Sequence, residues 1–123
     1  MPWKTNYNEA EKYIELTYSG IVTPEELFMA FENSMRLSKE HNTLLYLADC
    51  LEMVGGHSVI DLYGLIGLFD QLNISIDSKE AVLMKSLQNS AKEIEFYETA
   101  CRNRGFNVKL FTNRDEALDW LTA

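Results

Sequence analysis

Residues 43–50 read TLLYLADC, a continuous apolar run of strand length that ends in Asp49. A strand with one solvated face alternates apolar and polar residues, so an unbroken run indicates a strand that is covered on both faces. Such strands belong to mostly parallel sheets with helices packed against them. This stretch therefore predicts an α/β fold with a buried strand over residues 43–50.

Two aromatic and β-branched segments precede this strand. Residues 3–7 and 13–18 are separated by a polar turn, NEAE, which favours an antiparallel hairpin. The motif that follows, TPEE, predicts a helix start. Thr23 can cap the free N–H groups, proline suits the first helical position, and Glu26 can complete a capping box. The predicted helix ends near Glu40.

The rest of the chain continues this alternation of strands and helices. After a glycine-containing loop over 51–57, we expect a helix over 58–72, a strand over 81–84, a helix from Asn89 or Ser90 to Arg104, a strand over 107–112 and a last helix capped by Asn113. The predicted order is ββαβαβαβα, in a single domain that spans residues 1–123. Such a chain forms a five-stranded mixed sheet, antiparallel at its first strand and mostly parallel elsewhere, with four helices.

This layout resembles the STAS-type domains, which have the SpoIIAA-like fold, because Asp49 ends the buried strand and Ser58 opens the next helix. The last helix reads EALDWL at residues 116–121, which is similar to the EA-x-x-WL pattern that closes bacterial SpoIIAA-like (STAS/SEC14-type) proteins. The resemblance covers nearly the whole chain. It implies a small module without catalytic activity that binds a protein partner, a nucleotide or a hydrophobic ligand.

The resemblance also implies a modification site. Anti-sigma-factor antagonists of this fold carry a phosphorylatable serine at the start of the second helix, and Ser58 is the matching position. The surrounding pattern departs from theirs: His57 replaces the acidic residue, Val59 replaces a second serine, and Ile60 replaces a glycine. Ser58, with Asp49 and His57, is the candidate phosphorylation or anion site.

The loop that leaves the buried strand is the first place where the residues themselves suggest a site. Ligands of open α/β sheets bind outside the carboxyl ends of the strands. This loop gathers five polar or reactive residues around two glycines, namely Asp49, Cys50, Glu52, His57 and Ser58. A helix N-terminus there would stabilise a phosphate. Alternatively, Ser58 is only an N-cap, with Asp61 completing a weaker capping box, and the glycines only form a turn.

Composition excludes several classes of function. The chain has 11 Lys and Arg against 19 Asp and Glu, a net charge of -8, which disfavours binding to nucleic acids or anionic lipid surfaces. No apolar run reaches the roughly 20 residues of a membrane span. Cys50 and Cys101 are expected to be reduced thiols in a cytoplasmic protein. No metal-binding, cofactor-binding or catalytic spacing occurs, so we expect neither a metal, nor a cofactor, nor enzymatic activity.

The second predicted helix is the most unusual segment. Of the fourteen residues from Val59 to Leu72, nine are large and apolar, and a helix that is apolar nearly all round must bury most of its surface. Three alternatives for what covers the rest of this helix remain open: the following segment 73–79, a second subunit or protein partner, and a lipid-like ligand. The candidate residues of this partner or ligand surface are Ile60, Tyr63, Gly64, Leu65, Gly67 and Phe69.

These features predict a non-catalytic regulatory module that acts by protein–protein interaction around residues 55–72, with a homodimer as the expected assembly. The alternative is a carrier or sensor of a small hydrophobic ligand bound under the second helix. The two functions differ in a simple observable. An interface on this helix would make the pure protein dimerise, whereas a ligand pocket would leave a monomer that retains a bound molecule.

Overall fold

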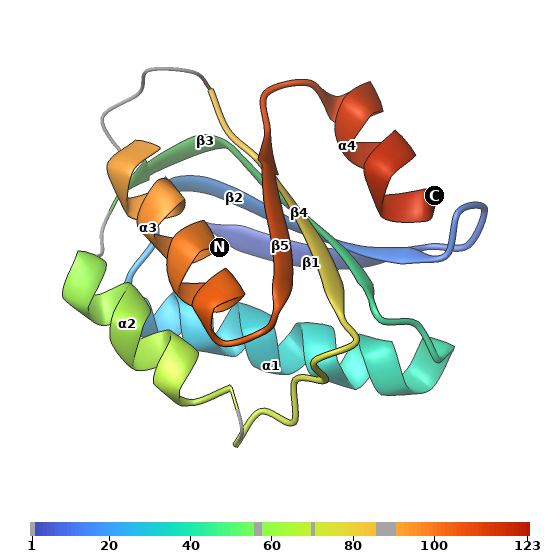
Figure 1. Ribbon diagram of the computed structural model, residues 1–123, viewed down its shortest axis with the longest axis horizontal. Coiled ribbons are helices and arrows are strands. Elements are labelled where there is room, and N and C mark those ends of the chain that lie inside the picture. Colours follow the sequence, from blue (N-terminus) through green and yellow to red (C-terminus); the bar gives the residue numbers. More distant parts are fainter. Residues whose placement is uncertain (1, 56–57, 70, 86–90) are drawn as a thin grey trace.

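The computed structural model describes residues 2–55, 58–69, 71–85 and 91–123. Its elements are β1 (Trp3–Asn8), β2 (Tyr13–Ile21), α1 (Pro24–His41), β3 (Leu45–Gly55), α2 (Val59–Gly67), β4 (Lys79–Leu83), α3 (Ala91–Asn103), β5 (Asn107–Phe111) and α4 (Arg114–Thr122). These strands form a five-stranded sheet in the order β1-β2-β3-β4-β5, the same as their order in the chain (Figure 1). β1 pairs antiparallel with β2, and every other neighbouring pair is parallel. The predicted α/β class, element order and mixed sheet are confirmed.

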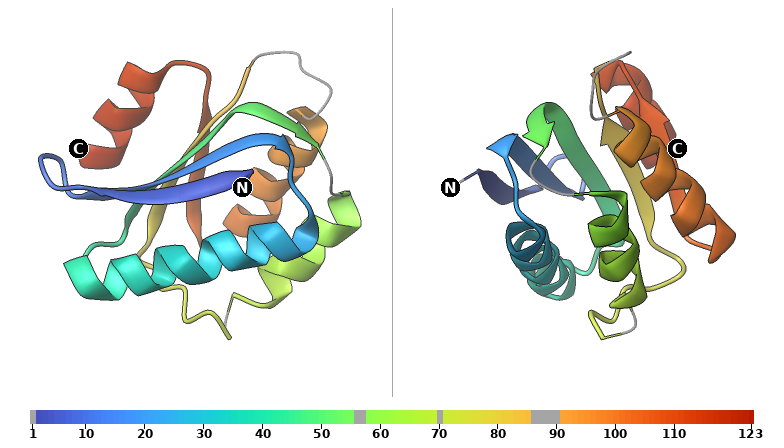
Figure 2. Two further views of the ribbon diagram at one scale, coloured as in Figure 1. Left: turned by 180° about the vertical axis from the view of Figure 1, so that it is seen from behind. Right: turned by 90° about the vertical axis from the view of Figure 1, so that its left-hand side faces the viewer.

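Helices cover the two faces of this sheet unequally. α1, α2 and α3 contribute apolar side chains to one large core, together with alternate residues of the strands. α4 packs on the opposite face, where Ala117 and Leu121 meet Leu47, Ala81 and Leu83 (Figure 2). The central strands β3 and β4 are therefore covered on both sides, which accounts for the unbroken apolar run over residues 43–50.

The ends of α1 follow from local signals. The Thr23 Oγ1 accepts a hydrogen bond from the Glu26 N–H at 3.3 Å, and the Glu26 carboxylate accepts one from the Thr23 N–H at 2.9 Å. This is the predicted capping box. At the other end, Asn42 adopts a left-handed conformation with φ of 52°, and its N–H donates to the Ser38 carbonyl. Asparagine is one of the few residues that tolerate this conformation, which ends the helix before β3.

The prediction of a loop over residues 51–57 is wrong for residues 51–55. β3 continues to Gly55 because it pairs with the end of β2, where Ile21 lies opposite Gly55. The Val22 N–H also donates to the Gly55 carbonyl at 2.7 Å. Cys50, which the sequence placed beside a loop, is consequently a buried residue within a strand.

α2 is shorter than predicted. It ends at Gly67 rather than near Leu72, and the chain continues through turns in which Phe69 and Leu72 remain buried. Gly64 and Gly67 account for part of this difference, because glycine in a helix interior costs about 1 kcal/mol relative to alanine. The predicted start of α2 at Ser58 is confirmed.

The carboxyl-terminal third agrees with the predicted signals where it is described. α3 is described from Ala91, so its predicted start at Asn89 or Ser90 lies outside the described residues. It ends before Gly105, which has φ of 86° and fills the expected left-handed position. Asn113 caps α4 by accepting a hydrogen bond from the Glu116 N–H at 3.0 Å.

Candidate functional site

The Ser58 hydroxyl is engaged in capping α2. Its Oγ accepts a hydrogen bond from the Asp61 N–H at 3.2 Å, and the Ser58 N–H donates to the Asp61 carboxylate at 2.8 Å. Both halves of the predicted capping box are therefore present. Ser58 is exposed, so its hydroxyl stays accessible, but this geometry needs no ligand to explain it. His57 lies outside the described residues.

Asp49 does not join Ser58. It lies in the middle of β3, six residues before the end of the strand, which corresponds to roughly 20 Å of extended chain. Its carboxylate accepts a hydrogen bond from the Leu51 N–H at 3.1 Å and lies 3.6 Å from the Arg114 guanidinium at the start of α4. The Asp49 side chain thus lies on the α4 side of the sheet. The prediction that Asp49 and Ser58 form one anion site is therefore wrong.

Replacing Ser58 with alanine tests its role as a cap. We expect S58A to lower the free energy of unfolding by about 1 kcal/mol, because the Asp61 N–H loses its acceptor. S19A is the matched control: Ser19 is exposed on β2, and such substitutions change stability by about 0.5 kcal/mol or less. Chemical denaturation of the three proteins measures the effect. Equal stability of S58A and S19A would contradict it.

α2 has a buried face and an exposed face. Leu62, Leu65 and Ile66 point into the large core, together with Phe69 just after the helix. The exposed face carries Ile60, Tyr63, Gly64 and Gly67, with Ile60 82% exposed and Tyr63 55% exposed. Leu65 and Phe69 are only 6% and 4% exposed, so their assignment to a partner-binding surface is wrong.

Segment 73–79 does not cover the outer face of α2. Its Ile74 packs against the large core, whereas its Ile76 is exposed and lies beside Gly105 after α3. Tyr63 instead lies beside α3: its ring centroid is 6.3 Å from that of Phe96, and the Arg104 guanidinium lies 5.0 Å above it. The face around Ile60 consequently stays open to solvent.

Two cavities lie between the sheet and the helices α1, α2 and α3. The first, which we call the Ser78 cavity, has a volume of about 40 Å³ and is lined by Leu16, Phe31, Ser34, Met35, Tyr46, Phe69, Ile74, Ser78, Glu80, Tyr97, Phe106, Asn107 and Val108. The second, the Tyr18 cavity, has a volume of about 50 Å³ and is lined by Tyr18, Leu27, Phe31, Ala48, Cys50, Met53, Leu62, Leu65, Glu80, Val82, Ile94 and Tyr97. By the same measure one water needs roughly 10 to 15 Å³, so each cavity has room for a few small groups.

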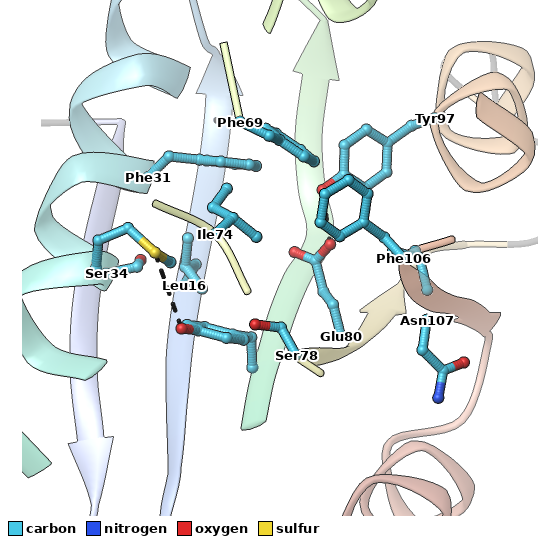
Figure 3. Close-up of a pocket in the computed structure, with 13 residues that line it drawn as sticks. Leu16, Phe31, Ser34, Phe69, Ile74, Ser78, Glu80, Tyr97, Phe106 and Asn107 are labelled. Atoms are coloured by element: carbon cyan, nitrogen blue, oxygen red, sulfur yellow. Dashed lines mark hydrogen bonds between the residues drawn. The ribbon is translucent and has the colours of Figure 1, made fainter. Parts of the chain in front are cut away.

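Glu80 lies between the two cavities and lines both of them. It belongs to β4, where the alternation of the strand places it on the same face as Val82. Its carboxylate accepts a hydrogen bond from the Tyr97 hydroxyl at 2.7 Å. Figure 3 shows the Glu80 side chain reaching into the Ser78 cavity, with Phe31 and Phe69 on one side and Tyr97 and Phe106 on the other.

Burial under three helices raises the pKa of the Glu80 carboxyl to about 7, and the hydrogen bond from Tyr97 only partly offsets this. Burial also raises the pKa values of the surrounding groups, so they stay neutral at physiological pH. These are the hydroxyls of Tyr18 and Tyr97 and the thiols of Cys50 and Cys101. Glu80 is therefore the group in this cluster that changes its charge near neutral pH.

One polar group beside Glu80 lacks a partner. The Tyr18 hydroxyl is buried in the Tyr18 cavity and has no hydrogen bond to any residue that the structure describes. Buried hydroxyls normally find a partner, because an unpaired one costs about 1 to 3 kcal/mol. The cavities thus combine apolar walls with unused hydrogen-bonding capacity, as is typical of small-molecule sites.

The comparisons with known proteins identify the fold. No protein-family model and no curated protein matches the sequence. A solved structure does match: an uncharacterized protein of the DUF3478 family from Shewanella loihica PV-4, which has a SpoIIAA-like fold. The TM-score is 0.61, the match covers 97% of this chain and 91% of the other, and the two sequences are 18% identical. The fold is SpoIIAA-like.

The resemblance to SpoIIAA-like domains is thereby confirmed at the level of the fold. The structure places Ser58 at the start of α2, as the sequence predicted. Modification of Ser58 stays a prediction. A phosphate there would lie beside the Asp61 carboxylate, whose negative charge would repel it.

Glu80 is not among the site residues predicted from the sequence of this SpoIIAA-like fold. The predicted strand began at Ala81, whereas β4 begins at Lys79, so Glu80 was left outside the sheet. The available signal was the alternation of Glu80, Val82 and Met84, which places a carboxylate on the same face as two core residues. Extending the strand by two residues would have revealed a partly buried acid on the core face.

The structure also bears on metal binding and on membrane insertion. Among the described residues, no group of three or more His, Cys, Asp and Glu side chains is arranged to hold a metal ion. None of the described helices combines the length and apolar composition that a membrane span requires.

Proposed function

We propose that the protein is a non-catalytic module that binds a small, largely apolar ligand between its sheet and the helices α1, α2 and α3. The observation that carries this proposal is the pair of apolar cavities on either side of the Glu80 carboxyl. Both cavities lie on the inner side of the helical layer, where Leu62 and Leu65 of α2 line one and Phe69, just after α2, lines the other. This is the carrier or sensor function that the sequence left as the alternative to a protein–protein interaction module.

The chemistry of the lining supports binding rather than catalysis. Both thiols near Glu80 are protonated at neutral pH, because burial raises the pKa of Cys101 to about 12 and that of Cys50 further. A protonated thiol is a poor nucleophile. The polar groups of the cavities can instead orient a ligand by hydrogen bonds while the aromatic walls supply apolar contact.

Filling the Tyr18 cavity tests this function. Ala48 lines that cavity from β3, so we expect A48L to occupy the space and to lower the amount of ligand that the purified protein retains at least tenfold. Native mass spectrometry of gently purified, tag-free protein measures the retained mass. A117L is the matched control, because Ala117 is equally buried but lies on the α4 side of the sheet.

Three results would contradict the proposal. One is a wild-type protein that carries no bound molecule and binds no apolar probe. The second is equal retention by A48L and wild type. The third is an equal loss in A48L and A117L when circular dichroism shows both to be folded, because the loss would then not depend on the cavity.

A second candidate function is self-association through the outer face of α2. The observation in its favour is the exposure of Ile60 and Tyr63, two large apolar side chains on one helix. Ile21 and Val54 are also exposed, at the paired ends of β2 and β3, and β3 precedes α2 in the chain. Exposed apolar side chains that cluster in this way often form interfaces. We propose a second copy of this chain as the occupant of this face.

Sedimentation velocity at several concentrations tests the second candidate. We expect the wild type to form a dimer and I60D to remain a monomer, because a charge at an 82% exposed position disrupts an apolar contact without affecting the core. T122D, at an exposed position on α4, controls for the added charge. A monomeric wild type, or a dimer that persists in I60D, would contradict this function.

A further inference from the structure

The described residues that line the two cavities include an acidic side chain but no basic one. Glu80 lines both of them and is the one carboxyl among their lining residues. No lysine, arginine or histidine of the described chain lines either cavity. None of the described residues that line the cavities supplies a counter-charge to an ionised Glu80, and a partly buried charge without one is costly. A ligand that brings a positive charge would remove this cost.

The Glu80 carboxylate also has unused hydrogen-bond acceptor positions. Among the described residues, the Tyr97 hydroxyl donates a hydrogen bond to the carboxylate, whereas a carboxylate offers about four acceptor positions. The Tyr18 hydroxyl in the Tyr18 cavity has no partner among the described residues. Each of these oxygens can accept a hydrogen bond. A group that carries several N–H donors and accepts none matches this set.

The aromatic side chains that line the Ser78 cavity are also suited to bind a cation. The rings of Phe31, Phe69, Phe106 and Tyr97 line the Ser78 cavity beside the Glu80 side chain (Figure 3). A cation within about 6 Å of an aromatic ring is attracted to its face, and a desolvated site strengthens the attraction. The hydrocarbon part of the same ligand would fill the apolar remainder of the cavities.

We propose that the ligand is a small hydrophobic amine, whose ammonium group pairs with the Glu80 carboxylate while its hydrocarbon chain lies against the aromatic and aliphatic walls. This inference rests on the proposed function, since it specifies the ligand of the same cavities. A primary ammonium supplies three N–H donors, enough for Glu80 and for a neighbouring hydroxyl. The two cavities limit the ligand to a short chain or a small ring.

The proposal predicts a pH dependence of amine binding. Because the pKa of Glu80 is about 7, the amine should bind roughly thirtyfold more weakly at pH 5.5 than at pH 8, in proportion to the ionised fraction of Glu80. The other titratable groups of this cluster are Tyr18 on β2, Tyr46 and Cys50 on β3, and Tyr97 and Cys101 on α3; their raised pKa values keep them neutral over this range. Arg104, whose charge acts on Cys101, lies over Tyr63 on the outer side of α3.

Titration calorimetry with three probes of equal chain length tests the amine: n-hexylamine, 1-hexanol and hexanoate. At pH 8 we expect wild type to bind n-hexylamine at least tenfold more tightly than 1-hexanol, and hexanoate most weakly. E80Q should lose the preference for the amine over 1-hexanol, because glutamine keeps the shape and the acceptor for Tyr97 but not the charge. E95Q removes one carboxylate from the exposed side of α3 and should leave the preference unchanged.

The outcomes separate this inference from the proposed function. Three outcomes would overturn the proposal of an amine ligand but leave the apolar binding site in place. They are equally tight binding of 1-hexanol and the amine, a preference for the amine that survives in E80Q, and a preference that disappears in E95Q. Tighter binding of hexanoate also overturns it. If wild type binds none of the three probes, the proposed site itself fails, and the inference fails with it.

Discussion

Replacing Leu65 with aspartate is expected to unfold the protein at neutral pH. Leu65 is 6% exposed and lines the Tyr18 cavity from α2, among apolar side chains of the large core. An isolated carboxylate in such surroundings costs several kcal/mol, added to the lost burial of leucine. Small domains are stable by about 5 to 15 kcal/mol, so this single change removes most or all of the stability. Loss of the cooperative thermal transition, followed by circular dichroism, measures it.

I60D is the matched control for L65D, because it introduces the same charge on the same helix. Ile60 is 82% exposed, so the new carboxylate stays in water and the free energy of unfolding should change by about 0.5 kcal/mol or less. A folded L65D protein with wild-type stability would contradict the buried orientation of this face of α2. Equal destabilisation by the two variants would contradict it as well.

The second large effect is a stability difference between E80Q and wild type that grows with pH. The pKa of Glu80 rises from 4.5 to about 7 on folding, so between these values the folded state holds a proton that the unfolded state has released. Stability from this group is therefore fully present below about pH 4.5 and is lost as pH rises through 7. At about 1.36 kcal/mol for each pH unit, the loss approaches about 3 kcal/mol. Glutamine is neutral at every pH and does not suffer it.

Urea denaturation at pH 5 and pH 8 measures this effect. We expect E80Q to be more stable than wild type at pH 8 by about 3 kcal/mol, and by far less at pH 5. E95Q makes the same change in net charge at an exposed position and controls for long-range repulsion in this acidic chain. A difference between E80Q and wild type that stays constant with pH would show that Glu80 does not titrate in this range.

Features that depend on neighbours in sequence were predictable. The capping boxes of Thr23 and Ser58 and the left-handed Gly105 each involve residues within a few positions of one another, and all three occur as expected. The unbroken apolar run at 43–50 likewise predicted a strand covered on both faces. Together with the alternation of strands and helices, these signals were enough for the class and the element order.

Features that depend on distant pairing were not predictable from local pattern. The extension of β3 to Gly55 comes from its pairing with Ile21, thirty-four positions earlier, and the glycine itself suggested a turn. The same extension separates Asp49 from Ser58, which a short loop would have brought together. Glu80 was missed because the predicted strand began two residues after the true start of β4. A residue outside a predicted strand is assigned to no face of the sheet.

Each parallel strand of this sheet is added on the same side of the previous one, and the connecting helices α1, α2 and α3 all pack on the same face. Doubly wound sheets differ, because their strand order reverses at one point, and the helices that diverge there open a crevice at the strand ends. The described strands contain no such reversal, so a ligand at Glu80 would contact one face of the sheet and the helices packed on it, rather than a crevice at the strand ends.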